Sequence, residues 1–269
     1  MSVSPARLGR KAITVPEPSE IWAWLGARWR GLVTALRRPE VRVLWSIVLL
    51  AAVLRLSSLD LIEFKADEAN HLVRGLEIVE QGRLPLVGGP SYYGPTKPPM
   101  MTYLMALPLA LGRDPRYAAA FIALLNVAAV AGTYGIARRY YGLRAALIAG
   151  LLFAVNPWAV VLSRKVFTAD LLAPMAVLLF GGMLAAVVDR RPWGWALSVV
   201  ALAVMLLTTY SPLPLLLVLG VVVVAYRRRV RWAYLLLGGL LAIVLASPFL
   251  YHLNVTRLQD LRDAMGQAG

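Results

Sequence analysis

Long apolar windows separated by short polar or charged segments make up most of the chain. The first window runs from about residue 43 to 59, and the others lie at about 117–137, 143–162, 169–188, 193–210, 212–226 and 232–250. A helix needs about 20 mostly apolar residues to cross the hydrocarbon layer of a bilayer. The pattern predicts an all-α fold, a polytopic transmembrane helix bundle with about seven spans.

A polar stretch, residues 60–116, separates the first two windows. Within it, residues 67–81 have an amphipathic pattern that predicts a helix. A loop rich in Pro, Gly and Tyr follows from Gly82 to Pro99, where the prolines prevent regular structure. Residues 98–111 are apolar but short for a span. We expect interfacial helices in this segment, the first outer loop.

Charge indicates whether residues 98–111 cross the membrane. Cytoplasmic loops collect Lys and Arg, and the N-terminal region is strongly basic, so the N-terminus is predicted to be cytoplasmic. If 98–111 does not cross, the basic segments at 138–144, 190–191 and 227–231 all fall inside; if it crosses, all three fall outside. We therefore interpret 98–111 as re-entrant or interfacial, in a multi-pass protein of the cell (plasma) membrane.

Composition narrows the class of protein further. The sequence is 59% hydrophobic with a net charge of +14, and its arginines cluster between apolar windows, as juxtamembrane cations do. This pattern argues against nucleic acid as a partner. No cysteine is present, which excludes disulfides and thiol catalysis. We expect residues 1–40 to form a cytoplasmic tail with a basic amphipathic surface helix, 41–254 a transmembrane module, and 255–269 an outer segment.

Two acidic sites fall on the same predicted outer face. Asp67 and Glu68 open the helix after the first span, and Asp170 follows Thr168 at the start of a later one. Each can be explained as ordinary helix capping. An ionised carboxylate held there can also accept a proton from an attacking hydroxyl, or bind a divalent metal cation. Two acids on one membrane edge favour function, because ionisable groups there are costly.

Cations and aromatic residues accompany these acids. Lys97 lies between prolines that restrict its backbone, at the level where a lysine suits a phosphate. Arg164 and Lys165 are exceptions to the positive-inside pattern, which favours an anionic partner, although contact with lipid phosphates explains them equally well. Weaker candidates for substrate binding are a cation near the end of the first span and two tyrosines that could stack on a sugar: Arg55, Tyr93 and Tyr210.

The order of these motifs resembles a known family. The chain is similar to the GT-C glycosyltransferases of the protein-mannosyltransferase and aminoarabinose-transferase group. The resemblance rests on a basic N-terminus and a span, followed in order by Asp67-Glu68-Ala69, Lys97-Pro98-Pro99, Ser163-Arg164 and Asp170. The resemblance implies a polyprenyl-phosphate sugar donor, membrane lipids as surroundings, and inversion at the anomeric carbon. It implies that Asp67 is the catalytic base, with Glu68 beside it, and that Lys97 and Arg164 bind the phosphate of the donor. It also implies that Asp170 is a second acid, which holds the acceptor, Lys97 or a metal shared with Asp67.

Length is where the chain departs from that group, whose members usually have about eleven or more spans. We expect the chain to be an N-terminal portion, with its activity alone left open. The acceptor stays open among a lipid, a polysaccharide and a protein. Two alternatives are a secondary transporter and a non-catalytic membrane scaffold. Charges at span ends and the lack of an evident internal repeat argue against a transporter, which places such groups near the bilayer midplane.

Overall fold

The computed structural model describes residues 22–23, 39–61, 65–88 and 97–266. The chain divides into two compact units, Met1–Trp45 and Ser46–Gly269. In the first unit the structure describes residues 22–23 and the start of α2. Among the described residues every regular element is helical, which confirms the predicted all-α class. The amphipathic surface helix predicted within residues 1–40 lies outside the described residues, except for residues 22–23.

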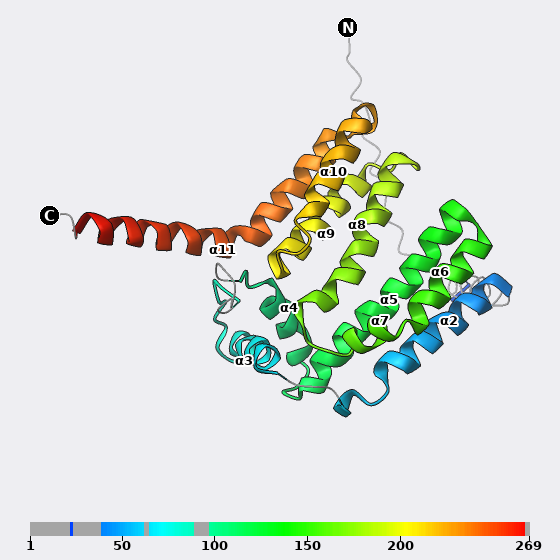
Figure 1. The fold of residues 1–269 in the computed structure, drawn as a ribbon, viewed down its shortest axis with the longest axis horizontal. Coiled ribbons are helices and arrows are strands. Elements are labelled where there is room, and N and C mark those ends of the chain that lie inside the picture. The colour runs from blue at the N-terminus through cyan, green and yellow to red at the C-terminus, as the bar shows by residue number, and fades with distance from the viewer. Residues whose placement is uncertain (1–21, 24–38, 62–64, 89–96, 267–269) are drawn as a thin grey trace, which may run out of the picture. The chain divides into compact units, whose positions relative to one another are not determined.

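The helices follow one another along the chain, and the longest connection, residues 82–99, joins α3 to α4 (Figure 1). In chain order the α-helices are α2 (Pro39–Leu56), α3 (Ala66–Gln81), α4 (Met100–Leu109), α5 (Pro115–Tyr141), α6 (Leu143–Val155), α7 (Pro157–Leu162), α8 (Leu172–Val187), α9 (Trp193–Thr208), α10 (Pro214–Ala225) and α11 (Trp232–Gly266). The described residues also form the short 3-10 helices η1 (Leu59–Leu61), η2 (Thr168–Leu171) and η3 (Arg227–Arg229).

A local core joins the first outer loop to the bundle. The predicted amphipathic helix forms as α3, and it packs on α4, which in turn contacts α5. Gly75 allows the close approach, because a Cβ there would lie 2.9 Å from Leu109 and 3.4 Å from the Ala106 nitrogen. The core residues come from α3, α4, α5 and the segment before α8: Leu72, Met101, Met105, Leu109, Ala118, Ala119, Ile122, Val166 and Leu171.

The rest of the second unit is a bundle of paired helices. α5 packs on α6 and α8, and α9 packs on α8 and α11. The contact between α8 and α9 is close at Gly182 and Gly194, where a Cβ on Gly194 would lie 2.4 Å from the Gly182 carbonyl oxygen. The Ser198 hydroxyl donates to the Leu179 carbonyl across the same contact, at 3.0 Å.

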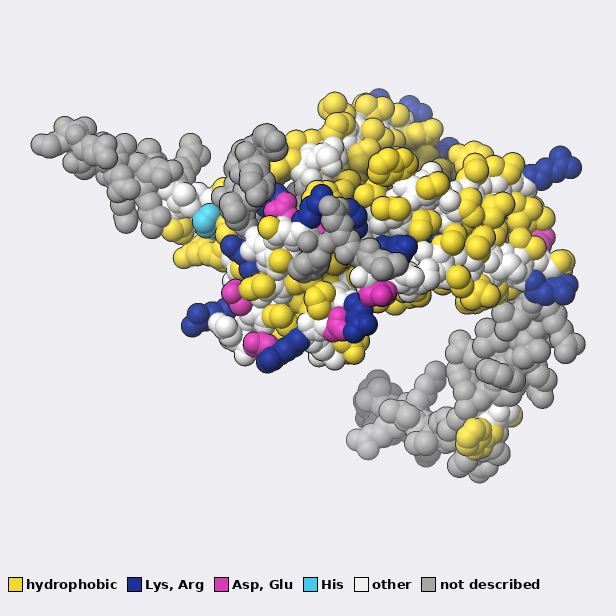
Figure 2. Space-filling view, turned by 60° about the horizontal axis from the view of Figure 1, so that its bottom comes forward, with side chains coloured by type: hydrophobic (Ala, Val, Ile, Leu, Met, Phe, Trp, Pro, Cys, Tyr) yellow, Lys and Arg dark blue, Asp and Glu magenta, His cyan; other side chains and the backbone are white. Residues whose placement is uncertain are grey.

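Helix length and composition support insertion in a membrane. In the described part of the chain, three helical segments are long and apolar enough to cross one, Pro115–Tyr141, Thr168–Val187 and Trp232–Thr256, and four shorter apolar helices accompany them. α4 has 10 residues, so it is about 15 Å long, half the hydrocarbon thickness. α6 and α10 are also short, so the interfacial or re-entrant placement of α4 and the number of seven spans both stay predictions. Figure 2 shows apolar side chains over much of the helical surface, with charged groups gathered in patches.

Two windows differ from the sequence prediction. The window at 143–162 forms two helices. α6 ends at Val155, and the Asn156 side chain caps α7 by accepting a hydrogen bond from the Ala159 N–H at 3.0 Å. Pro157 then takes the first helical position of α7, where its missing N–H costs nothing. The last helix, α11, continues past residue 250 to Gly266, although Pro248 lies inside it.

Candidate active site

An ion pair links the first turn of α3 to the end of the proline-rich loop. The Lys97 Nζ lies 3.6 Å from Asp67 Oδ2, with the side chains 24% and 37% exposed. The backbone around Lys97 is held by a hydrogen bond from the Gly88 N–H to the Lys97 carbonyl, at 2.7 Å. A Cβ on Gly88 would lie 2.4 Å from the Pro98 carbonyl oxygen, so this approach requires glycine. The ion pair is therefore partly open to solvent, while hydrogen bonding and close packing hold the Lys97 backbone in place.

The base of this loop has further anchors. The Tyr103 hydroxyl donates to the Pro85 carbonyl at 2.6 Å, and an Arg74 guanidinium nitrogen donates to the Val87 carbonyl at 3.0 Å. Arg74 in turn donates to the Asn70 side chain at 3.1 Å. These bonds tie Pro85 to α4 and Val87 to α3.

Glu68 is buried beside Asp67. Its carboxylate accepts from the Lys65 N–H at 3.1 Å, so it caps α3 as the sequence pattern allows. It also lines a pocket of about 300 Å³. One residue thus orders the helix start and reaches a cavity.

This pocket brings the two predicted outer loops together. Its lining residues are Leu59, Asp60, Glu68, Asp114, Pro115, Arg116, Ala119, Arg164 and Val166. Arg164 donates to the Ser58 carbonyl, while its Nε has no hydrogen-bond partner among the described residues. The hydrogen bond from Arg116 lowers the pKa of Asp114. Charged groups of both signs therefore surround the pocket.

Asp170 is 4% exposed at the start of α8. Its Oδ2 accepts from the Phe167 N–H at 3.0 Å, while its Oδ1 has no partner in the described part of the chain. Its carbonyl accepts from the Asn126 side chain at 3.0 Å. Asp170 lies within electrostatic range of Glu68 and of Lys165. The second acid is thus buried near the first loop, but the ion-pair partner of Lys97 is Asp67.

The other predicted residues lie in different settings. Arg55 is fully buried and donates to the carbonyls of Phe153 and Ala154 at the end of α6, each at 2.8 Å, so its partners are backbone groups. Tyr210 lies between α9 and α10 and is 38% exposed. Tyr93 lies outside the described residues.

Asp67 and Asp170 were predicted to share a metal ion. No group of three His, Asp or Glu side chains placed to hold a metal ion is found among the described residues. Asp67 already has the Lys97 ammonium as its counter-ion. A cation shared by Asp67 and Asp170 stays a prediction.

His71 is a residue of this region that the sequence did not single out. It is 3% exposed, and its Nδ1 lies 3.5 Å from the Thr102 hydroxyl of α4. Burial lowers its pKa to about 4, with Lys97 and Arg74 adding to this and Asp67 opposing it. The imidazole is therefore neutral at pH 7. The available signal was its position four residues after Asp67, which places both on one helix face.

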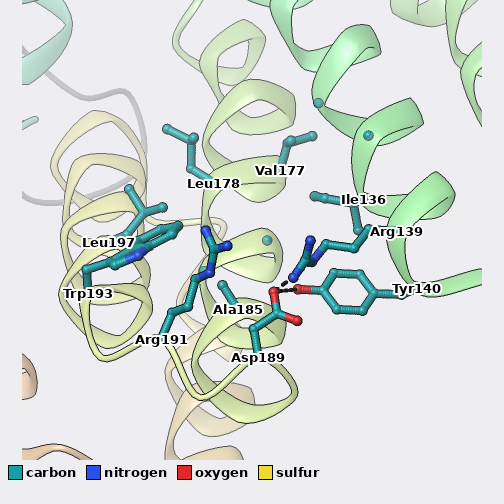
Figure 3. Close-up of a pocket in the computed structure, with 14 residues that line it drawn as sticks. Ile136, Arg139, Tyr140, Val177, Leu178, Ala185, Asp189, Arg191, Trp193 and Leu197 are labelled. Atoms are coloured by element: carbon teal, nitrogen blue, oxygen red, sulfur yellow. Dashed lines mark hydrogen bonds and ion pairs between the residues drawn. The ribbon is translucent and has the colours of Figure 1, made fainter.

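A second pocket lies at the other end of α5 and α8 (Figure 3). It measures about 350 Å³ and contains none of the predicted site residues. Asp189 accepts from Arg139 at 2.7 Å and from the Tyr140 hydroxyl at 2.9 Å, and the Arg139 hydrogen bond lowers the pKa of Asp189. The remaining wall is mostly apolar. This pocket offers no pair of acids for acid–base chemistry.

The fold and the site define a helical membrane protein with buried acids at one end of its bundle. Residues 96–252, more than half of the chain, match the family described as dolichyl-phosphate-mannose-protein mannosyltransferase, and the chain belongs to this family. It is thus a membrane glycosyltransferase of the GT-C type. The matched range includes Lys97, Arg164 and Asp170 but begins after Asp67. Comparisons with curated proteins and with solved structures found no match.

Proposed function

We propose that the protein transfers a sugar from a polyprenyl-phosphate donor to an acceptor at the outer face of the plasma membrane, with inversion. The Asp67–Lys97 ion pair supports this best, because it holds a carboxylate and a phosphate-binding cation together at a membrane edge. The donor's isoprenoid chain would lie along the apolar helices, with its phosphate at the interface.

In the proposed reaction, an acceptor hydroxyl attacks the anomeric carbon as the bond from that carbon to the phosphate oxygen breaks. Asp67 accepts the hydroxyl proton as general base. Lys97 stabilises the negative charge that develops on the departing polyprenyl phosphate. Attack opposite the leaving group gives a product of inverted configuration.

The neighbouring pocket supports a binding role for the second outer loop. Glu68 and Arg164 line it together, so residues about a hundred positions apart face one cavity. Arg164 carries a guanidinium nitrogen without a partner in the described chain, which leaves a donor for a phosphate oxygen. Asp170 is buried nearby, and its Oδ1 has no hydrogen-bond partner among the described residues, so it would position the acceptor or the first loop.

The test is transfer of labelled mannose from a polyprenyl-phosphate mannose donor by the protein in proteoliposomes. Asp67→Asn should lower the rate at least about 100-fold, because the amide cannot accept the proton. Glu77→Gln, which removes an exposed acid from the same helix, should leave the rate within about twofold. Transfer by Asp67→Asn at the wild-type rate would contradict the assignment. Retention of the donor's anomeric configuration, measured by NMR, would exclude inversion.

A further inference from the structure

Four arginines surround a pocket at the end of the bundle opposite the candidate active site. The pocket measures about 550 Å³ and is lined by Arg190, Arg228, Arg229, Val230 and Arg231. Asp170 precedes α8 and Arg190 follows it, so the two sites are separated by a helix of 16 residues, about 24 Å.

The pocket has a defined framework. Arg229 donates to the Val187 carbonyl at the end of α8, at 2.7 Å, and its own carbonyl accepts from the Trp195 indole at 3.4 Å. Val230 is buried in a small core with Ala186, Val187 and Trp195. The loop between α10 and α11 is therefore docked on the ends of α8 and α9, which holds its arginines beside Arg190.

The lining of this pocket, as far as the structure describes it, carries positive charge and no acid. Asp189, the acid next to Arg190, is engaged by Arg139 at 2.7 Å. Within the described residues, no carboxylate forms an ion pair with Arg190, Arg228 or Arg231. Guanidinium groups so arranged repel one another and match the oxygens of phosphate groups.

The surroundings indicate what carries that phosphate. α10 and α11 leave large apolar side chains exposed next to the pocket, including Val224 at 71% and Leu236 at 69%. Tyr226 and Trp232 flank the arginine segment and are exposed as well, as aromatic residues at a membrane interface are. Apolar chains can lie against these helices while the headgroup enters the pocket.

We propose that this pocket is a binding site for the headgroup of an anionic membrane lipid with two phosphate charges, such as cardiolipin. Its volume exceeds what one phosphate fills, and none of its four arginines is paired with a carboxylate in the part of the chain that the structure describes. Basic pockets between transmembrane helices are suited to such headgroups. The site would bind a lipid of the leaflet opposite to the one where transfer is proposed.

The experiment measures cardiolipin retained by the purified protein, by native mass spectrometry and by titration in nanodiscs of phosphatidylcholine. Arg228→Lys with Arg231→Lys keeps the charge, and with it the charge-determined membrane orientation, but removes two guanidinium forks; binding should fall at least tenfold. Cardiolipin binding should fall similarly in Arg190→Gly. This variant should still fold, because Arg190 has φ 54°, a conformation that favours glycine.

Control variants distinguish a specific lipid site from general attraction between a basic protein surface and anionic lipid. Arg144→Gln removes one exposed arginine outside the pocket and should leave cardiolipin binding unchanged. If the lysine variant binds cardiolipin as wild type does, the arginines act only as surface charge and the proposal is overturned. Displacement of cardiolipin by equimolar soluble pyrophosphate would overturn the lipid as ligand. Circular dichroism and thermal unfolding check that each variant is folded.

Discussion

The two ends of the bundle carry charge in different ways. At one end of the bundle, Asp67, Glu68 and Asp170 are partly or fully buried, and each is paired with a cation or bonded to the backbone. At the other end, arginines gather around a pocket with no acid in its lining. The positive-inside tendency accounts for an arginine excess at one end but predicts no buried acid at the other. The buried acids therefore carry the stronger argument for chemistry.

The first prediction compares one ion pair from each end. Lys97→Met should lower sugar transfer about 100-fold, because Asp67 loses its counter-ion and the leaving phosphate loses a cation. Arg139→Met breaks the pair with Asp189 at the other end, and transfer should stay within about threefold. Rates at saturating donor would measure both. Equal losses in the two variants would show that the pairs serve folding rather than transfer.

The second prediction uses pH to probe the packing beneath the active site. His71 has a native pKa of about 4 against an ordinary value of 6.5, so the unfolded chain binds more protons between these values. The free energy of unfolding should therefore fall as pH decreases from about 6.5 to 4, by about 3 kcal/mol at most.

Unfolding in detergent at several pH values measures this slope, with His71→Gln as the variant that should flatten it. A slope that persists in His71→Gln would place the titrating group elsewhere.

The third prediction contrasts a buried helix cap with an exposed one. Asp170→Ala leaves the Phe167 N–H without its acceptor and should cost about 1 to 2 kcal/mol in stability. Asn156→Ala removes a cap at the exposed start of α7 and should cost less, because water can replace the acceptor. Melting temperatures in one detergent give the comparison. A larger loss for Asn156→Ala would contradict it.

Sequence patterns located the elements better than their tertiary partners. The amphipathic period predicted a helix at 67–81, and α3 spans Ala66–Gln81, because that signal depends on local spacing. The break between α6 and α7 at Pro157 was not predicted, because the hydropathy is continuous there and the break depends on a helix cap. Arg55 was a substrate candidate, yet its guanidinium contacts the end of α6, a partner a hundred residues away. The shifted pKa of His71 likewise arises from burial, which the sequence does not contain.

The smallest expected effect comes from an ion pair that is well formed but exposed. Arg113 Nε lies 2.8 Å from Glu80 Oε1, a shorter contact than the one between Lys97 and Asp67, with side chains 79% and 41% exposed. Water and salt screen such a pair, so Glu80→Gln should change stability by less than about 0.5 kcal/mol and leave transfer unchanged. Unfolding and transfer measured together test this. A loss of transfer comparable to that of Lys97→Met would mean that distance alone, rather than position beside the reacting groups, decides which pairs matter.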